Sequence, residues 1–124
     1  MKSHPQIITR IIESIREART ICIVGHMRPD GDCAGSQLGL MLALRAEGKK
    51  VVCWNQDSVP QKYKFLDPDG DIQKPRPGQK FDLVIATDCA NFERLGTVGK
   101  YVAKRKLLIN IDHHESNTRY GDLN

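Results

Sequence analysis

Four short runs of apolar residues constrain the fold of this chain more than any other feature of its sequence. They occupy residues 20–25 (TICIVG), 50–54 (KVVCW), 81–87 (FDLVIAT) and 106–111 (KLLINI). Each run is apolar nearly throughout, whereas a strand with one wet face alternates apolar and polar residues. Continuous runs of this length are typical of parallel strands that are buried on both faces. The sequence therefore predicts a parallel sheet with helices on both sides.

Segments with helical patterns lie before and between these runs. The expected helices are residues 5–18, where isoleucines recur at helical spacing, residues 37–47, which Gly48 closes, and residues 97–105. The Pro- and Gly-rich stretch 60–78 is expected to hold at most one helical turn, near residues 61–66. With right-handed crossovers, this order predicts an open, doubly wound, mainly parallel α/β sheet of the Rossmann-like kind.

Composition limits the protein class. A chain of 124 residues with 40% hydrophobic content can bury one core, so one domain or part of one is expected. No apolar run approaches the roughly 20 residues that span a bilayer, and the N-terminus lacks a signal core, so we expect a cytoplasmic protein with no membrane contact. The four cysteines lack C-x-x-C spacing and are expected to be reduced thiols. A formal charge of +4 favours a polyanionic ligand without requiring one.

Imidazole and carboxylate groups follow three of the four apolar runs. His26, Asp30 and Asp32 follow the first run, Asp88 the third, and Asp112, His113 and His114 the fourth. In open α/β sheets, ligands bind beyond the carboxyl ends of the strands. Each of these residues, taken alone, can also be explained as part of a loop, a turn or a helix cap. Their joint occurrence at three strand ends predicts a metal site, and hence a metal-dependent hydrolase.

A repeated tetrapeptide shows that the sequence around the aspartates, rather than the aspartates alone, indicates a metal site. The sequence Pro-Asp-Gly-Asp occurs at residues 29–32 and again at residues 68–71. The second copy lacks the downstream Gly and Glu of a calcium loop, so we expect a surface turn there. The first copy differs because an apolar strand and His26 precede it. Ala34, Gly35 and Ser36 follow it and are expected to open a helix, whose backbone N–H groups suit a phosphate.

Two further pairs near these residues have open interpretations. Asn91 and Arg94 follow Asp88 closely and could reach a phosphate or cap the next helix. Cys33 and Cys89 each follow a candidate ligand, which raises the hypothesis of a thiolate ligand or a redox switch. Neighbouring side chains usually point to different sides, which argues against that hypothesis. The phosphate loop of nucleotide triphosphatases, the dinucleotide fingerprint and the serine hydrolase elbow are all absent from the sequence.

The candidate residues together resemble the first three motifs of the DHH phosphoesterase superfamily. The resemblance rests on His-Met-Arg-Pro-Asp-Gly-Asp-Cys-Ala-Gly-Ser at residues 26–36, Asp88 in Ala-Thr-Asp-Cys-Ala-Asn, and the Asn-Ile-Asp-His-His block at residues 110–114. It is closest to the bifunctional oligoribonuclease and phosphoadenosine-phosphate phosphatase group, and it spans residues 20–124. Family members carry a fourth motif and a smaller C-terminal substrate-binding domain, and neither is found in this sequence. Residues 1–124 therefore resemble the N-terminal part of the catalytic domain of a longer enzyme.

Carried over residue by residue, the resemblance implies a site for two metal ions. His26 and Asp30 would bind one ion, Asp32 and His113 the other, and Asp88 would bridge both. The resemblance implies that His114 contacts the substrate phosphate and that Asp112 orients the loop or an imidazole. Oxygen-rich ligands with imidazole suit Mn²⁺, with Mg²⁺, Co²⁺ or Zn²⁺ as alternatives.

The resemblance implies a manganese-dependent phosphoesterase in which metal-activated water attacks the phosphate. The expected substrates, and hence partners, are short oligoribonucleotides, adenosine bisphosphate, or both. Alternatives within the superfamily are a cyclic dinucleotide phosphodiesterase, a pyrophosphatase and an exopolyphosphatase. A contrasting alternative is an inactive fragment that binds a metal or a nucleotide. A homodimer is also compatible with the sequence.

Overall fold

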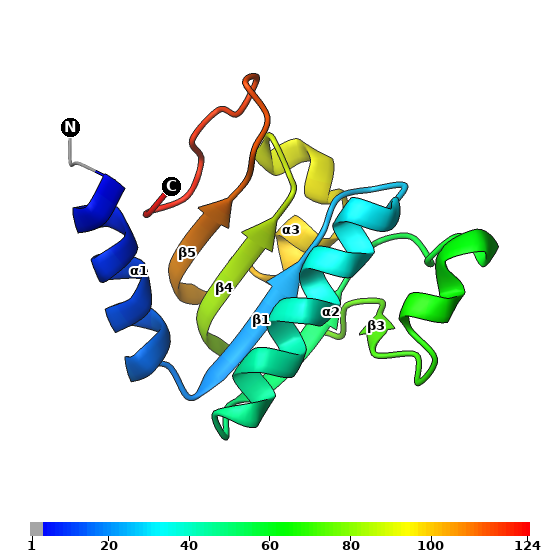
Figure 1. The fold of residues 1–124 in the computed structure, drawn as a ribbon, viewed down its shortest axis with the longest axis horizontal. Helices are drawn as coiled ribbons and strands as arrows, with labels where there is room; N and C mark the ends of the chain where they lie inside the picture. Colours follow the sequence, from blue (N-terminus) through cyan, green and yellow to red (C-terminus); the bar gives the residue numbers. More distant parts are fainter. Residues whose placement is uncertain (1–3) are drawn as a thin grey trace.

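The computed structural model of the chain describes residues 4–124 and shows one parallel sheet between helices (Figure 1). Its strands are β1 (Thr20–Val24), β2 (Lys50–Trp54), β3 (Ile72–Gln73), β4 (Phe81–Thr87) and β5 (Arg105–Ile111). The spatial order is β3-β2-β1-β4-β5, and every neighbouring pair is parallel. This confirms the predicted α/β class, and the four apolar runs are four of the five strands. Within residues 4–124, no helix combines the length and apolar composition needed to cross a membrane.

The short strand β3 was not predicted. It pairs with the end of β2 through Ile72 and Gln73, within the Pro- and Gly-rich stretch. Two residues are too few to show a strand periodicity, and their neighbours favour turns. The turn predicted within that stretch is the six-residue 3₁₀ helix η1 (Gln61–Leu66).

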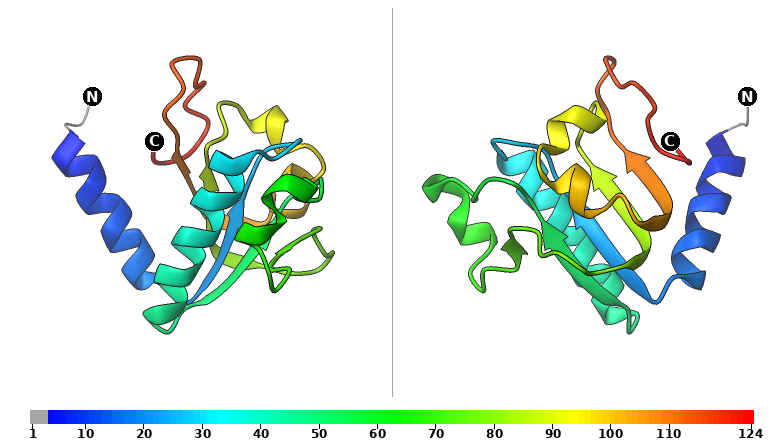
Figure 2. Two further views of the ribbon diagram at one scale, coloured as in Figure 1. Left: turned by 45° about the vertical axis from the view of Figure 1, so that its right-hand side comes forward. Right: turned by 180° about the vertical axis from the view of Figure 1, so that it is seen from behind.

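Helices cover both faces of the sheet, as predicted. On one face, α2 (Gly31–Ala46) and part of α1 (His4–Glu17) pack on a core cluster of β1, β4 and β5 side chains that includes Ile23, Ile85 and Ile109. On the other face, the 3₁₀ helix η2 (Phe92–Leu95) and α3 (Val98–Tyr101) cover a second cluster (Figure 2). The sheet is therefore the middle layer, and its strand ends are left for loops.

Two helix boundaries differ from the prediction. The second helix starts at Gly31, six residues before the predicted Gln37 and three before Ala34, because the Asp30 side chain accepts a hydrogen bond from the Cys33 amide and caps the helix there. The helix expected over residues 97–105 ends at Tyr101, and its predicted last residue, Arg105, already pairs with Phe81 as the first residue of β5.

A buried amide pair joins the carboxyl ends of β1 and β2 to α2. Gln37 and Asn55 are almost fully buried and exchange two hydrogen bonds of 2.8 Å. Gln37 also donates to the Ile23 carbonyl, and the Gly25 amide donates to Asn55 Oδ1 at 2.9 Å. Every bond in this group crosses from one element to another, so the group fixes the loop that begins at His26.

Gly25 is the one glycine of this group, and its missing side chain makes room for the amide pair. A Cβ atom at residue 25 would lie 2.5 Å from Gln37 Oε1, 2.6 Å from Cys33 Sγ and 2.7 Å from Asn55 Oδ1. These atoms are held by their own hydrogen bonds and cannot move aside freely. Any larger residue at this position therefore disrupts the network behind His26.

We predict that Gly25→Ala destabilises the protein by about 1–3 kcal/mol, because the added methyl overpacks a buried polar group. The control is Gly39→Ala in α2, where a Cβ would meet nothing within 4 Å. That change should stabilise by about 0.5–1 kcal/mol, because alanine favours a helix interior over glycine. Urea unfolding followed by circular dichroism measures both. Equal stability of Gly25→Ala and the wild type would show that the amide pair is not fixed.

Candidate metal centre

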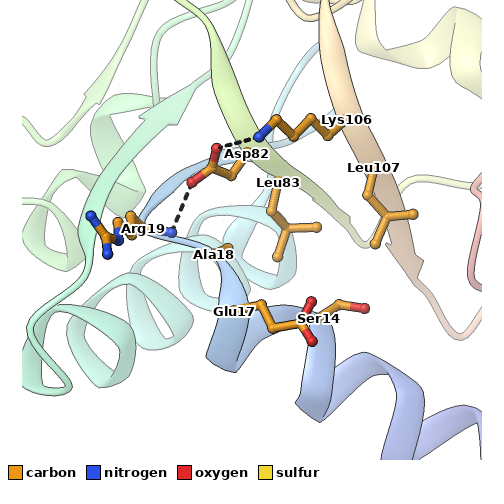
Figure 3. A pocket seen from close by; sticks show the side chains of 8 residues that line it. All are labelled: Ser14, Glu17, Ala18, Arg19, Asp82, Leu83, Lys106 and Leu107. Atoms are coloured by element: carbon orange, nitrogen blue, oxygen red, sulfur yellow. Dashed lines mark hydrogen bonds and ion pairs between the residues drawn. The ribbon is translucent and has the colours of Figure 1, made fainter.

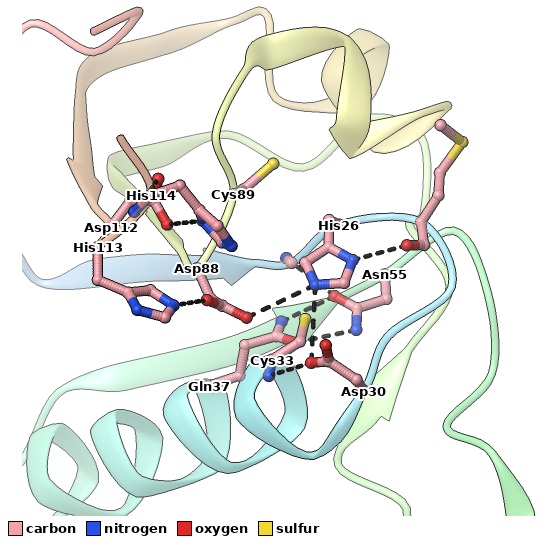
Figure 4. A network of polar contacts seen from close by, with 12 residues as sticks. His26, Asp30, Cys33, Gln37, Asn55, Asp88, Cys89, Asp112, His113 and His114 are labelled. Carbon is pink, nitrogen blue, oxygen red and sulfur yellow. Dashed lines mark hydrogen bonds and ion pairs between the residues drawn. The ribbon is translucent and has the colours of Figure 1, made fainter. Parts of the chain in front are cut away.

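Six of the predicted site residues, His26, Asp30, Asp88, Asp112, His113 and His114, meet at the carboxyl edge of the sheet (Figure 4). His26 follows β1, Asp88 follows β4, and Asp112, His113 and His114 follow β5. Strands β1, β4 and β5 are neighbours in parallel register, so their ends lie at the same level. The backbone amide of Asp88 donates to the Ile111 carbonyl at 3.0 Å, which ties the ends of β4 and β5 together.

The carboxylate of Asp88 lies between two imidazoles. Its Oδ1 is 2.7 Å from Nε2 of His113, and its Oδ2 is 3.6 Å from Nε2 of His26. The residue is only 7% exposed and has a positive φ of 56°, a region that Asp tolerates better than most residues. One carboxylate thus presents a different oxygen to each of two histidines, which is the arrangement of a bridging ligand.

His26 is oriented by its own loop. Its Nδ1 lies 2.6 Å from the carbonyl oxygen of Met27, and a carbonyl can only accept, so Nδ1 carries the proton. Nε2 is then left as an acceptor, and it lies 3.8 Å from Asp30 Oδ1. Ligand atoms of His26, Asp30 and Asp88 all lie within 4.8 Å of one another, a spacing that suits a shared cation.

A second group of ligand atoms shares Asp88. It consists of Asp88, Asp112, His113 and His114, whose ligand atoms also lie within 4.8 Å of one another. The hydrogen bond that His113 donates to Asp88 raises the pKa of His113 above its usual value, and the charges of Asp112 and Asp32 act in the same direction. A cation that binds both His113 and Asp88 must displace this proton.

Asp112 is occupied by neighbouring donors. Its side chain is 1% exposed, and its Oδ1 lies 2.6 Å from His114 Nδ1. Its Oδ2 accepts from Asn117 Nδ2 at 2.8 Å and from the His114 amide at 3.3 Å. Burial raises the pKa of Asp112, but the hydrogen bonds from Asn117 and His114 outweigh it, and the pKa is lowered overall. The ionised carboxylate therefore holds the ring of His114 in place.

Asp32 belongs to neither group of close ligand atoms. It is exposed in the first turn of α2 and lines a cavity of about 530 Å³ next to the second group. The other lining residues are Ser36, Leu40, Thr87, Asp88, Ile111, Asp112 and His113. The structure thus brings Asp32 to the same cavity as His113 and Asp88 without direct contact.

The helix that was expected to bind phosphate with its first N–H groups begins earlier in the chain than Gly35 and Ser36. Gly35 and Ser36 are the fifth and sixth residues of α2, so their backbone N–H groups lie within the helix rather than at its free end. Gly35 does not line the cavity, whereas the side chain of Ser36 does. A role for Ser36 toward phosphate depends on its hydroxyl group.

Asn91 and the repeated tetrapeptide have structural roles. Asn91 Oδ1 accepts from the Arg94 amide at 2.9 Å and caps η2, so the capping interpretation of Asn91 is confirmed. The second Pro-Asp-Gly-Asp copy forms a turn whose residues 68–70 are exposed, as predicted, and Asp71 pairs with Arg45 at 3.0 Å. Neither Asp69 nor Asp71 belongs to a group of candidate ligands.

Sequence reasoning missed the polar residues that support the site. Asn110 donates to the carbonyls of Ala86 and Cys89 and accepts from Asn117 at 2.7 Å, beneath the Asp112 loop. Asn110 could have been found from the sequence, because a side-chain amide within an apolar strand is buried and needs hydrogen-bond partners. Asn117, Gln37 and Asn55 gave no such signal, since their partners are distant in sequence or unrecognisable before folding.

Comparisons with known proteins find relatives of this chain. A family model described as "DHH family, N-terminal domain" matches residues 20–123. The bifunctional oligoribonuclease and PAP phosphatase NrnA of Thermus thermophilus is 38% identical over 109 residues, which are 83% of this chain and 30% of that protein. The protein of the same name from Bacillus subtilis is 33% identical over 129 residues, covering 93% of this chain and 36% of its own. The chain thus spans about a third of the length of these relatives.

A solved structure shares the fold. The crystal structure of an exopolyphosphatase-related protein from Bacteroides fragilis superposes with a TM-score of 0.85 at 23% sequence identity. The match covers 99% of this chain and 39% of that one. The α/β architecture of residues 4–124 therefore also occurs as part of a longer chain.

We predict that Thr87→Val stabilises the metal-free protein by about 1 kcal/mol, because it removes an unpaired buried hydroxyl. Thr87 Oγ1 is the one buried side-chain nitrogen or oxygen in residues 4–124 without a hydrogen-bond partner. The control is Thr20→Val, which should destabilise because Thr20 Oγ1 accepts from the Asp82 amide at 3.0 Å. Thermal unfolding in EDTA compares the two. A destabilised Thr87→Val variant would mean that the hydroxyl has a partner, such as a bound water.

We predict that the native protein resists thiol reagents at pH 8, a result that would argue against a redox-active thiolate beside the metal centre. All four cysteines are free and buried, and burial raises the pKa of Cys33 to about 12. Burial also raises the pKa of Cys89, the other cysteine next to a candidate ligand. Because the thiolate is the reactive form, Ellman's reagent should titrate almost no thiol in the native state and all four in guanidinium chloride. Rapid reaction of one thiol in the native state would instead support a reactive thiolate, as a redox switch requires.

Proposed function

The chain belongs to the DHH family, and on this premise we propose that its metal centre hydrolyses phosphate esters of short oligoribonucleotides or of adenosine bisphosphate. The observation that carries the proposal is the Asp88 carboxylate, whose two oxygens face two separate imidazoles. A two-metal phosphoesterase needs a ligand of this kind, because it must hold both ions close to one water. The relatives named as oligoribonuclease and PAP phosphatase suggest the substrate class.

The donor atoms divide into two ion sites that share Asp88. His26 and Asp30 supply an imidazole and a carboxylate at the first site, and His113 and Asp32 supply the same pair at the second. Asp30 Oδ1 already accepts the Cys33 amide, so the helix cap holds this ligand in place. Asp32 lies one residue into the helix and reaches its site across the cavity. Mixed imidazole and carboxylate donors suit Mn²⁺, with Mg²⁺, Co²⁺ or Zn²⁺ as competitors.

Bound ions would lower the pKa of a shared water and neutralise the phosphoryl oxygens while the water attacks the phosphorus atom. The remaining residues bind and orient the phosphate. Asp112 fixes His114 through Nδ1, which leaves the opposite ring nitrogen of His114 for a phosphate oxygen. Ser36 offers a hydroxyl from the wall of the same cavity. No covalent intermediate is needed, and none of the cysteines takes part.

Residues 1–124 are, in this proposal, the N-terminal part of a catalytic domain. The relatives are about three times as long, and the part of them beyond the match would supply the fourth motif and the substrate-binding domain. That additional part would then decide which substrate is used: an oligoribonucleotide, adenosine bisphosphate, a cyclic dinucleotide, pyrophosphate or polyphosphate. A panel of these five substrates separates the main proposal from its alternatives.

The first experiment pairs metal content with hydrolysis. The chain is dialysed against Mn²⁺, bound metal is measured by atomic emission, and release of mononucleotide or phosphate is followed for each substrate. About two ions per chain with manganese-dependent cleavage supports the proposal. Binding of metal without turnover of any substrate would identify an inactive metal-binding fragment.

We predict that Asp88→Asn lowers bound Mn²⁺ to about one ion per chain or fewer and lowers hydrolysis at least about a hundredfold. Asparagine is chosen because it tolerates the positive φ of residue 88, so the backbone is preserved. The matched control is Asp69→Asn, the same change in the exposed turn of the repeated tetrapeptide, which should alter neither quantity. Full metal content in Asp88→Asn would rule out the bridging role.

A further inference from the structure

Each of the four long strands begins beside basic residues. Arg19 precedes β1, Lys49 precedes β2 and Lys50 begins it, Lys80 precedes β4, and Lys104, Arg105 and Lys106 lie at the start of β5. Parallel strands place these starts at one edge of the sheet, opposite the metal centre. The register confirms this, because Thr20 pairs with Lys50 and Phe81 pairs with Arg105. We call this group of seven cations the basic edge.

The basic edge accounts for the net charge of the chain. Its seven cations are accompanied by three acids, namely Glu17, Glu47 and Asp82. This excess of four equals the formal charge of +4 of the whole sequence. All other basic and acidic residues therefore balance one another, and the positive charge is concentrated where no candidate catalytic group lies.

Three of these seven cations are free to bind a ligand, and a fourth, Lys106, is largely exposed. Lys50, Lys80 and Lys104 are exposed, and their side chains have no partner within residues 4–124. Lys106 is 82% exposed and lies 3.6 Å from Asp82 (Figure 3). Lys49 and Arg105 instead bind backbone carbonyls and keep their charge in a fixed position.

Attraction of substrate to the metal centre does not explain the basic edge. The strand between the two edges, β4, has seven residues and is therefore about 20 Å long at roughly 3.3 Å per residue. Exposed charges are screened over about 8 Å at physiological ionic strength. The basic edge lies more than two such lengths from the metal centre, so a ligand must bind at this edge itself to benefit from it.

We propose that the basic edge binds the phosphate backbone of a single-stranded nucleic acid, at a surface separate from the metal centre. Four parallel strands about 4.8 Å apart spread the cations over about 14 Å, which suits several successive phosphates. A hollow of about 470 Å³ opens beside Arg19 and Lys106 (Figure 3). Leu83 and Leu107 line it together with Glu17 and Asp82, so it offers both aliphatic contacts and hydrogen-bond acceptors. Such a recess can take an unstacked base, which a duplex does not offer, while the phosphates lie along the exposed lysines.

The composition of the edge favours a nucleic acid over a membrane surface. Membrane-binding surfaces combine cations with large apolar side chains that enter the lipid. The large exposed apolar residues of the described chain are Ile8, Ile12, Leu42, Phe65, Tyr101 and Ile111. None of them lies within two residues of the start of β1, β2, β4 or β5. The basic edge thus supplies charge without an apolar anchor.

The test measures binding of a fluorescein-labelled 20-nucleotide oligouridylate by anisotropy, in EDTA and at several salt concentrations. EDTA removes metal, so the result stands whether or not the metal centre is catalytic. The edge variant replaces Lys50, Lys80, Lys104 and Lys106 by Gln. The matched control replaces Lys62, Lys64, Lys74 and Arg76 by Gln, which removes the same charge from the exposed stretch between β2 and β4. Circular dichroism checks the fold, and the double variant Lys50→Gln, Lys80→Gln replaces the quadruple one if that fails to fold.

The edge variant is expected to bind roughly tenfold more weakly or worse, and the slope of log K against log salt should fall by about 0.7 for each lost contact. The control variant should bind like the wild type. Equal weakening of both variants would mean that only net charge matters, and it would overturn the proposal. Two other results would also overturn it. One is unchanged oligonucleotide binding by the edge variant, and the other is a wild-type protein that binds phosphatidylglycerol vesicles but not the oligonucleotide.

Discussion

Parallel alignment of β1, β4 and β5 is the constraint on which the candidate site depends. Because these neighbouring strands end at the same level, groups more than 80 residues apart in sequence meet around the carboxylate of Asp88. The bond from the Asp88 amide to the Ile111 carbonyl extends the ladder between β4 and β5 into the site itself. The acidic groups are therefore brought together by backbone hydrogen bonds between the strands. These bonds hold the groups close even when no cation is bound to offset their mutual repulsion.

The sequence predicted the parts of the fold that burial dictates. The apolar runs 20–25, 50–54 and 81–87 became β1, β2 and β4 with boundaries correct to one residue, since strands covered on both faces admit few polar residues. The prediction failed where a single hydrogen bond sets a boundary: the cap at Asp30 starts α2 six residues before the predicted Gln37. It also missed β3, because a two-residue strand depends on the edge of β2 rather than on its own composition.

The candidate ligands were also predicted from sequence, but their supports were not. Behind His26 lies the Gln37–Asn55 pair, and beneath Asp112 lie Asn117 and Asn110. Both supports are amides that bond across elements, and such pairings exist only after the fold has formed. The site thus consists of an inner set of ionisable groups with a recognisable spacing and an outer set of neutral amides without one.

The left-handed backbone of Asp88 limits which amino acids can replace it without strain. A φ of 56° costs most L-residues about 1–2 kcal/mol, and glycine, asparagine and aspartate adopt it most readily, although Arg28 and Arg119 also have a positive φ in this chain. Glutamate would keep the negative charge, yet the main chain disfavours it. Glycine and asparagine suit the main chain, yet neither carries a carboxylate. Among the residues that adopt this φ most readily, aspartate alone carries a carboxylate, so an exchange at residue 88 costs either backbone strain or the negative charge.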